Sequence, residues 1–551
     1  MLRYTIASIL LGIPFVLATA QEIGGVVTAQ RGMVVCVSPE AADVGVAVLK
    51  QGGSAVDASV AVAFAMAVTY PAAGNIGGGG FMLVNPAKGE PTVIEYRETA
   101  PGSVKADTFA KTTDWRDHKA SGVPGTVRGL ELAHKKFGKL PWKDLVLPAV
   151  KLADGGFVLD APMVKSLNDA SKGKGGNDEF RKLFGKEGGW QLGDRLIQKD
   201  LAKTLRLIAE KGPDAFYTGE LADLLIAEMK AGSGYITLDD LKSYQAKERE
   251  PIHGTYRGHD IYGPPPPSSG GIALVEMLNI LEQFDLRKMG AGSAEARHVM
   301  AETMKRAFAD RARYVGDPDF TRVPGFLTSK EHAKKLSGTI DLRKATPSME
   351  LAEGIPLAKE SDSTTHFSVI DADGLAVSNT YTLEDSFGSK VVVPGAGYIL
   401  NNEMGDFNAR PGITTTKGRI GTEPNLVAPG KRMLSSQTPT IVVRDGKVLL
   451  VTGSPGGRTI INTVLCVVTN VIDFEMDVQS AVNAPRQHHQ WFPDELTFEG
   501  KNPDLVKKLE ALGHKVRTQK QGDAHAIWID PKTGIYHGAA DKRINGKAVG
   551  Y

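Results

Sequence analysis

Cysteine is nearly absent from the sequence, which holds only Cys36 and Cys466 among its 551 residues. Two thiols cannot build a disulfide framework or a four-thiolate zinc site. A single bridge between them is an alternative, because an oxidising compartment would permit it. We favour the other interpretation, in which both are small buried hydrophobic residues of a large domain.

The sequence also lacks an excess of charge of either sign. It has 65 Lys and Arg residues against 63 Asp and Glu residues, a formal net charge of +2. Such a balance gives no overall attraction to nucleic acid or to an anionic membrane surface, so neither is an expected partner. A hydrophobic content of 42% and a charged content of 23% are ordinary for a globular protein. They exclude a wholly disordered chain and a protein with many membrane spans.

Long apolar runs are missing after the first twenty residues. Residues 1–20 place Arg3 before an apolar stretch from Ile6 to Leu17, and Ala18 and Ala20 supply the small residues of a cleavage site. This order predicts a secretory signal peptide that is removed, and an exported protein, periplasmic or secreted. The alternative is a membrane anchor, but an apolar stretch of roughly 12 residues is short for a hydrocarbon core of about 30 Å. We therefore expect no stable membrane span after cleavage.

The pattern of the chain changes near Ser363. Before it the periodicity is mainly helical, and we treat Lys172–Asn177 and Tyr262–Gly271 as linker-like because they are rich in Gly or Pro. After it strand signals dominate, with two hairpins that turn at Asp373-Gly374 and Asp445-Gly446. Predicted helices are Ala41–Gln51, Gly53–Val68, Val127–Phe137, Leu145–Asp154, Lys199–Lys211, Gly219–Ala231, Gly271–Phe284, Ala294–Tyr314, Thr459–Phe474 and Pro503–Leu512. Predicted strands are His366–Ile370, Leu375–Leu383, Thr440–Arg444, Lys447–Thr452, Leu496–Glu499, His514–Arg517 and Ala526–Ile529.

Two glycine clusters and one histidine pair carry no cofactor signal. The loop Gly453–Gly457 lies between a strand and a helix and could present backbone N–H groups to an anion, but it lacks the Gly-Lys-Ser/Thr of a Walker loop. Ile76–Phe81 does not fit a dinucleotide-binding fingerprint. His488 and His489 are adjacent, and neighbouring strand residues point to opposite faces, so they seldom bind one ion. We expect neither a cofactor nor a metal.

A series of ordered motifs gives the sequence its strongest signal, and they span about Gly32 to Tyr551. They are Gly53–Ala58, Gly74–Phe81, Tyr96–Glu98, Gly122–Gly125, Pro264–Gly271, Thr364–Val369, Asn401–Met404, Leu434–Ser436, Thr452–Gly457 and Asn483–Trp491. In these motifs the chain resembles the γ-glutamyltranspeptidases, or glutathione hydrolases, of the N-terminal-nucleophile superfamily.

The resemblance implies an α+β fold, an αββα sandwich in which two stacked sheets are covered by helices. It also implies one precursor that cuts itself at the Ser363–Thr364 bond. The products would be a large, helix-rich subunit, 21–363, and a small, strand-rich catalytic subunit, 364–551, which remain together as one intertwined fold.

Thr364 would act as the nucleophile. A threonine hydroxyl is a poor nucleophile at neutral pH and needs a base beside it. Within the chain Thr364 has only a non-basic amide nitrogen, but cleavage frees an α-amine, a group with a reference pKa near 8 that suits proton transfer. The resemblance assigns Thr382 to orienting this nucleophile. It assigns the backbone N–H groups of Gly456 and Gly457 to the oxyanion.

The implied substrates are glutathione and other γ-glutamyl compounds, with water, amino acids or dipeptides as acceptors. A γ-glutamyl group carries both a carboxylate and an ammonium, so its pocket needs paired opposite charges. The family pattern assigns the carboxylate to Arg97 with Ser435 and Ser436. It assigns the ammonium to Asp406, with Glu403 and Glu384 as further acceptors.

Several departures from the family pattern bear on substrate preference. Glu384 stands where many members have Asn, and Gly405 replaces an acid beside Asp406. Ala409–Arg432 matches a segment that covers the pocket, yet it contains no tyrosine to act as the family's gate. Two rival functions remain: an acylase of the same superfamily that takes glutaryl side chains of β-lactams, and a catalytically inactive exported homologue.

Overall fold

The computed structural model describes residues 25–551 apart from 113, 353–363, 413, 418 and 419. The predicted signal peptide and Ser363 therefore lie outside the described residues. Within those residues, no helix is both long enough and apolar enough to cross a bilayer.

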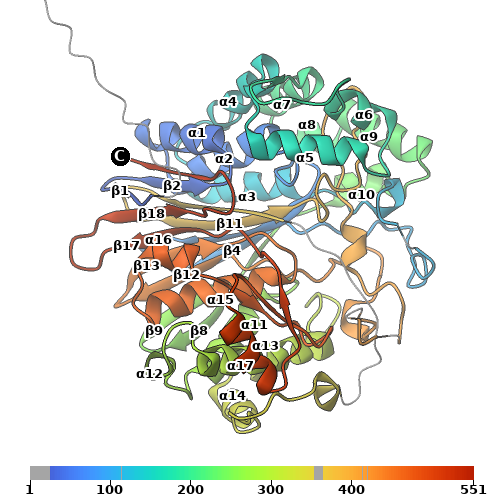
Figure 1. The fold of residues 1–551 in the computed structure, drawn as a ribbon. Helices are drawn as coiled ribbons and strands as arrows, with labels where there is room; N and C mark the ends of the chain where they lie inside the picture. Colours follow the sequence, from blue (N-terminus) through green and yellow to red (C-terminus); the bar gives the residue numbers. More distant parts are fainter. Residues whose placement is uncertain (1–24, 113, 353–363, 413, 418–419) are drawn as a thin grey trace, which may run out of the picture.

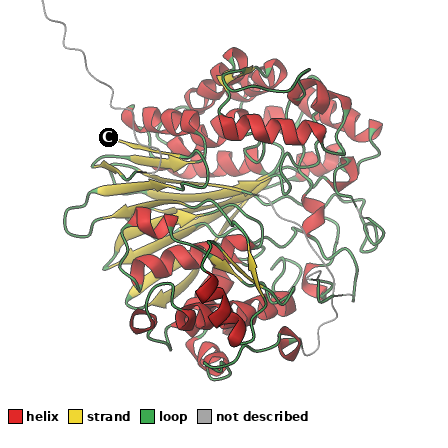
Figure 2. Ribbon diagram, viewed as in Figure 1, coloured by secondary structure: helices red, strands yellow, loops and turns green. Residues whose placement is uncertain are grey.

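Two seven-stranded antiparallel sheets form the centre of the molecule (Figure 2). In order across the first sheet the strands are β1 (Val27–Ala29), β18 (Tyr536–Ala540), β17 (His525–Ile529), β13 (Lys447–Gly453), β12 (Thr440–Arg444), β9 (His259–Gly263) and β8 (Ile252–Tyr256). Across the second they are β19 (Lys547–Gly550), β2 (Met33–Cys36), β10 (Thr365–Ile370), β11 (Ala376–Thr382), β3 (Gly79–Asn85), β4 (Thr92–Glu95) and β7 (Lys247–Arg249). The sheets pack face to face, with β10 and β11 against β13.

Helices cover the outer face of each sheet (Figure 1). On the second sheet lie α1 (Pro39–Lys50), α2 (Ala55–Thr69) and α3 (Thr126–Phe137), with α4 (Trp142–Gly155), α5 (Ala161–Lys172), α6 (Asp178–Phe184), α7 (Lys199–Lys211), α8 (Asp214–Tyr217), α9 (Glu220–Ala231) and α10 (Leu238–Ser243) on the same side. On the first lie α11 (Gly270–Leu281), α15 (Thr459–Ile472) and α16 (Val478–Asn483), with α12 (Leu286–Met289), α13 (Ala294–Tyr314), α14 (Lys330–Ser337) and α17 (Pro503–Ala511) on that side. The order helix, sheet, sheet, helix confirms the predicted αββα sandwich.

Smaller elements complete the described chain. A third sheet joins β14 (Gln487–His488), β15 (Leu496–Phe498) and β16 (Val516–Thr518), and β5 (Phe157–Val158) pairs with β6 (Arg195–Leu196). Single 3₁₀ turns are η1 (His118–Ala120), η2 (Gly325–Thr328), η3 (Ser348–Leu351), η4 (Glu403–Asp406) and η5 (Glu423–Asn425).

Helix α2 shows why the local sequence folds as predicted. Ser54 accepts a hydrogen bond from Asp57 N and the Asp57 carboxylate accepts one from Ser54 N, which is a complete capping box. Every residue from Ala55 to Thr69 is buried. The short apolar run is thus a core helix between the second sheet and the outer helices.

The first half is mainly helical, as predicted, but the sequence analysis missed its strands. Strands β2, β3, β4 and β7 belong to the second sheet and β1, β8 and β9 to the first, and all precede Thr364. They are short, and several are buried on both faces, so they lack the alternation that reveals a half-buried strand. The segment Tyr262–Gly271 was also misread: it is buried from Gly263 onward and includes the end of β9 and the start of α11, so it is not a linker.

The two cysteines are free and buried, in separate core clusters. Cys36 lies on β2 among residues packed with α1 and α2, whereas Cys466 lies on α15 on the far side of the sandwich. Burial raises the pKa of the Cys36 thiol to about 12. The favoured interpretation of both as small buried hydrophobic residues is confirmed.

Candidate active site

Thr364 lies where three strand ends meet. It immediately precedes β10, is 8% exposed, and is next to the pair Thr365 and Tyr381 at the start of the β10–β11 ladder. The opposite sheet approaches closely here. A Cβ on Gly453, at the end of β13, would lie 2.3 Å from the His366 imidazole, so only glycine lets the two strands come so near. The fold therefore brings the ends of β11 and β13 to the start of β10.

One narrow pocket opens at this junction. Its lining includes eight residues that the sequence predicted: Arg97, Thr364, Thr382, Glu384, Asp406, Ser435, Ser436 and Gly457. The other two predicted residues that are described lie just behind it. Gly456 precedes Gly457, and Glu403 is fully buried beside Arg97. The structure thus brings the described candidates into one place, without by itself assigning their roles.

The hydroxyl of Thr382 is oriented by the turn that follows β11. Its Oγ1 accepts a hydrogen bond of 2.8 Å from the backbone N–H of Glu384, whose φ of +78° is in the left-handed region. Because that oxygen already accepts from a fixed donor, the hydroxyl hydrogen of Thr382 must be donated elsewhere. This is the geometry expected of a residue that orients a neighbouring oxygen or nitrogen.

The glycine loop between β13 and α15 has a backbone that other residues could not adopt easily. Gly456 has a φ of +126°, and a Cβ there would lie 2.5 Å from Thr459 Oγ1. Gly457 has a φ of +54° and lines the pocket. The loop leads directly into the first turn of α15, and backbone N–H groups at a helix N-terminus favour negative charge. An oxyanion is the kind of group that such a loop stabilises.

Arg97 is surrounded by acids. The guanidinium is 1% exposed, and its Nη1 lies 2.7 Å from Glu403 Oε2 and 3.5 Å from Glu98 Oε2. Its Nη2 pairs with Asp406. Glu384, Glu403 and Asp406 each place one carboxylate oxygen within 4.8 Å of the other two. Three carboxyl groups thus pair with one arginine, and a fourth, that of Glu384, lies close to them.

This crowding shifts the carboxyl pKa values upward. Burial raises the pKa of Glu98 to about 7. Burial also raises the pKa of Glu384 well above its usual range, and the nearby charges of Asp406 and Glu403 raise it further. The pKa of Glu403 moves in the same direction, mainly through burial and against the opposing charge of Arg97. A bound cation would relieve this repulsion, so the cluster is complementary to an ammonium group.

The serine pair rests on a buried segment that the sequence presented as a linker. Ser435 N donates to Pro267 O at 2.8 Å, and Ser435 O accepts from both Ser269 N and Ser269 Oγ, at 2.9 and 2.7 Å. Ser436 Oγ accepts from Arg311 Nη2 at 3.1 Å. The proline-rich segment therefore holds the two serines against the pocket.

Comparison with known proteins agrees with this geometry. The Gamma-glutamyltranspeptidase family model matches residues 41–551. The chain is 47% identical to a glutathione hydrolase proenzyme of Escherichia coli K12, over 100% of this chain and 99% of the relative. This chain belongs to the γ-glutamyltranspeptidase family.

Solved structures give the same result for the fold. A cephalosporin acylase from Bacillus halodurans has a TM-score of 0.85 at 28% identity and covers 98% of this chain and 99% of its own. A γ-glutamyltranspeptidase from Pseudomonas nitroreducens, complexed with L-DON, has a TM-score of 0.54 at 43% identity and covers 57% of this chain and 95% of its own. The fold is thus shared by transpeptidases and acylases, and the pocket has to distinguish them.

Four further residues line the pocket: Arg311, Gln437, Arg458 and Ile460. The sequence analysis assigned none of them a role in the site, although Gln437 and Arg458 directly follow recognised motifs. Arg311 had a subtler signal. Helix α13 is buried almost continuously from Ala294 to Ala312, and an arginine within so buried a helix must have a polar partner.

Asn425, within the predicted covering segment Ala409–Arg432, bonds to the backbone of two neighbouring loops. Asn425 Nδ2 donates to Asp406 O at 2.7 Å, and Asn425 Oδ1 accepts from Leu434 N at 2.8 Å. One side chain therefore ties the backbone of the acid cluster to the loop that carries the serine pair. That the segment also covers the pocket stays a prediction.

The histidines His488 and His489 are held by protein partners. His488 Nδ1 lies 2.7 Å from Asn462 Nδ2, and its Nε2 lies 2.9 Å from Gln490 Oε1. His489 Nδ1 accepts from Trp491 N, and its Nε2 lies 3.3 Å from Asp494. These contacts give the pair a structural role in its motif.

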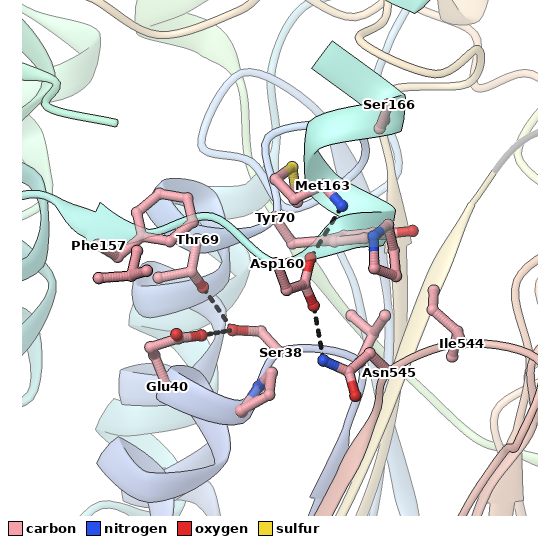
Figure 3. Close-up of a pocket in the computed structure, with 14 residues that line it drawn as sticks. Ser38, Glu40, Thr69, Tyr70, Phe157, Asp160, Met163, Ser166, Ile544 and Asn545 are labelled. Atoms are coloured by element: carbon pink, nitrogen blue, oxygen red, sulfur yellow. Dashed lines mark hydrogen bonds between the residues drawn. The ribbon is translucent and has the colours of Figure 1, made fainter. Parts of the chain in front are cut away.

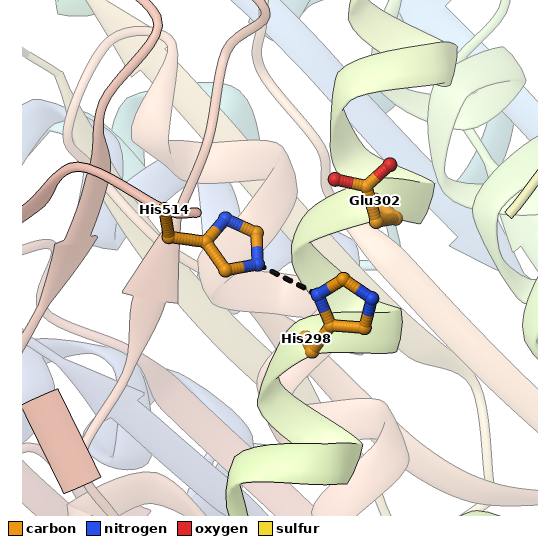
Figure 4. Close-up of side chains that lie close together, drawn as sticks. All are labelled: His298, Glu302 and His514. Atoms are coloured by element: carbon orange, nitrogen blue, oxygen red, sulfur yellow. Dashed lines mark hydrogen bonds between the residues drawn. The ribbon is translucent and has the colours of Figure 1, made fainter. Parts of the chain in front are cut away.

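Contacts across the Ser363–Thr364 boundary are numerous, and two lie far from the pocket. In Figure 3, Asp160 accepts from Asn545 at 2.7 Å beside a second pocket that Ser38, Thr69 and Tyr70 also line. In Figure 4, His298 Nδ1 and His514 Nε2 lie 2.8 Å apart, near Glu302. Glu302 already pairs with Lys305 and Arg306, so this trio is a poor cation site.

We expect His514 to make folding sensitive to acid. Burial lowers its pKa to about 3, with help from the positive charge of Lys305. The folded pKa lies below the unfolded value near 6.5, so the stabilisation is complete above about pH 6.5 and is lost as the pH falls toward 3. Between pH 6 and 4, the free energy of unfolding of a His514→Gln chain should depend less steeply on pH than that of the parent. The slope should differ by about 1.4 kcal/mol per pH unit, because one proton fewer is taken up on unfolding.

Denaturant unfolding at a series of pH values, on a chain kept uncut by Thr364→Ala, measures this slope. The matched control is His253→Gln, which makes the same substitution at an exposed histidine. Parallel profiles for the parent and His514→Gln would contradict the assignment.

Proposed function

We propose that this chain is an exported precursor that cleaves itself at Ser363–Thr364 and then acts as a γ-glutamyltransferase and glutathione hydrolase. One observation supports this most strongly: a threonine that can become a chain terminus shares one pocket with a buried arginine, an acid cluster and a serine pair. The first feature is suited to acyl transfer. The others are suited to the zwitterionic end of a glutamyl group.

Maturation would use the same hydroxyl as turnover. Thr364 Oγ1 attacks the carbonyl carbon of Ser363, and the hydroxyl proton passes to the Thr364 nitrogen as the peptide C–N bond breaks. Ser363 is then joined to Thr364 Oγ1 by an ester, and the α-amine of Thr364 is free. Water then hydrolyses the ester and returns the hydroxyl. The products 21–363 and 364–551 stay joined, because β2, β3, β4 and β7 pair in one sheet with β10, β11 and β19.

In turnover the freed α-amine would take the proton of Thr364 Oγ1 as this oxygen attacks the γ-glutamyl amide carbon. The backbone N–H groups of Gly456 and Gly457 stabilise the resulting oxyanion, an interaction of about 3–4 kcal/mol for one such donor. The amine returns the proton to the nitrogen of the leaving group, and this leaving group is cysteinylglycine when glutathione is the donor. Water, an amino acid or a dipeptide then attacks the acyl-threonine ester.

The acid cluster distinguishes this function from that of the acylases that share the fold. A glutaryl group has the carboxylate of a γ-glutamyl group but lacks its ammonium. Glu384, Glu403 and Asp406 crowd one end of the pocket, and an acyl group without an ammonium would leave that repulsion uncompensated. We therefore propose a γ-glutamyl donor.

The test compares γ-glutamyl-p-nitroanilide with glutaryl-p-nitroanilide. Loss of one partner of a desolvated charge pair costs about 2–5 kcal/mol, so kcat/KM should favour the γ-glutamyl substrate by about 30-fold or more. Preference for the glutaryl substrate would indicate an acylase. An uncut chain without activity toward either would indicate the inactive homologue.

Replacing Arg97 should weaken binding more than chemistry. Arg97→Ala removes a buried cation and its charged hydrogen bonds, each worth about 1.5–3 kcal/mol, so KM for γ-glutamyl-p-nitroanilide should rise by about 10- to 100-fold with a smaller change in kcat. Arg97→Lys keeps the charge but not the planar guanidinium, so its KM should lie between that of the parent and that of Arg97→Ala. Unchanged KM and kcat in Arg97→Ala would exclude the residue from substrate binding.

A further inference from the structure

Neighbouring donors fix the hydrogen-bonding roles of the two serine hydroxyls in the pocket. Gln437 N donates to Ser435 Oγ at 3.1 Å, and Arg311 Nη2 donates to Ser436 Oγ at 3.1 Å. Neither a backbone N–H nor a guanidinium can accept in return. Each serine oxygen therefore acts as acceptor, and each O–H hydrogen is left to be donated. Two hydroxyl donors side by side suit a carboxylate.

Arg311 is connected to both serines. Besides its bond to Ser436, its Nε donates to Ser269 Oγ at 2.8 Å, and Ser269 Oγ in turn donates to Ser435 O at 2.7 Å. The residue projects from α13, is 7% exposed and lines the pocket. Its position thus fixes the Ser436 side chain directly and the Ser435 backbone through one intermediate.

Arg97, which also lines the pocket, is less able to hold a substrate carboxylate alone. Nη2 of Arg97 pairs with Asp406, and Nη1 faces Glu403 and Glu98. A substrate carboxylate must compete with those acids for Arg97. Within the part of the chain that the structure describes, the serine hydroxyls bond to no carboxylate, and they lie beside the guanidinium of Arg311.

We propose that Arg311 is a positioning residue for the substrate α-carboxylate: it holds Ser436 as a donor, anchors Ser435 and adds positive charge at that end of the pocket. This inference rests on the proposed function, since it takes the γ-glutamyl group as the ligand. It divides the pocket into an end for the carboxylate, with Arg311, Ser435 and Ser436, and an end for the ammonium, with Asp406 and Glu384.

Three p-nitroanilides separate the two ends. The γ-glutamyl substrate carries both charged groups, the glutaryl substrate only the carboxylate, and the 4-aminobutanoyl substrate only the ammonium. In Arg311→Met, kcat/KM should fall about 10- to 100-fold for the first two, mainly through KM for the γ-glutamyl substrate. For 4-aminobutanoyl-p-nitroanilide it should change by less than about threefold, since no carboxylate is there to lose. Rates are taken per cleaved chain.

Three further variants keep the test decisive. Arg311→Lys retains the charge and a donor, so it should recover part of the loss for carboxylate-bearing substrates. Because Arg311 acts through Ser436, its replacement should matter less in a Ser436→Ala background. Arg313→Met is the matched control: Arg313 is on the same helix but pairs with Asp310 and does not line the pocket, so its kinetics should match the parent.

An equal loss in Arg311→Met for all three substrates, including the one without a carboxylate, would overturn the inference and leave a structural role. The inference would also be overturned if Arg311→Met lowered kcat/KM by the same factor in the Ser436→Ala background as in the parent. Failure of the proposed function is distinguishable, because the parent enzyme would then not hydrolyse γ-glutamyl-p-nitroanilide.

Discussion

Thr364→Ala should accumulate as a single uncut chain with no measurable turnover. The substitution removes the hydroxyl that we propose as the attacking group, so the α-amine should never be released and the proposed nucleophile and base should be lost together. Loss of an enzyme nucleophile lowers rates by about 10⁴-fold or more. A denaturing gel and a γ-glutamyl-p-nitroanilide assay measure the two effects. Thr364→Ser is the matched control, because it keeps a hydroxyl and an α-amine and should be cleaved and active at a reduced rate.

Cleavage and catalysis can be separated by supplying the two products as individual exported chains. The small chain would begin at residue 364 once its leader is removed. With Thr364 in place this pair should be active without any self-cleavage, and with Ala at that position it should be inactive. Normal cleavage of full-length Thr364→Ala would show that another residue is the nucleophile.

Asp406→Asn should invert the preference of the pocket for its substrate. The carboxylate of Asp406 is partly exposed to the pocket and pairs with Arg97, whereas Glu403 is fully enclosed. Its loss removes the accessible partner of the ammonium, and kcat/KM for γ-glutamyl-p-nitroanilide should fall by about 10²- to 10³-fold. The same change frees Nη2 of Arg97 for a carboxylate, so the glutaryl substrate should be hydrolysed as well as before or better.

Asp385→Asn is the control for this experiment. Asp385 follows Glu384 in the chain but lines a different pocket, and its bond to Asn402 survives in the amide. The selectivity of this variant should equal that of the parent. Equal losses for both substrates in Asp406→Asn would mean that the residue supports the structure of the site and does not recognise the ammonium.

The sequence predicted elements with strong local signals. Strand Thr440–Arg444 and helices Lys199–Lys211 and Ala294–Tyr314 have the predicted bounds, since turn residues, caps and periodicity agree there. Several short strands of the first half were missed, and β1, β2, β3 and β9 each pair with a strand more than 150 residues away. Thr382 of β11, for example, pairs with Gly79 of β3. Such pairings leave little trace in local periodicity.

The site shows the same division. Motifs carried by a family resemblance located Thr364, Arg97 and Asp406, and the fold places them in one pocket. Composition and periodicity alone could not have located these three residues, because they come from separate segments that only the folded sandwich brings together. Arg311 was missed for a related reason: its role depends on Ser269 and Ser436, each contributed by a different segment.

The central claim is that a hydroxyl acquires its own base when the chain is cut before it. Edman sequencing of the smaller fragment of the purified protein tests it most directly. The account predicts Thr-Thr-His-Phe-Ser, beginning at Thr364. A fragment that begins at any other residue, or an active preparation that contains only the intact chain, would contradict it.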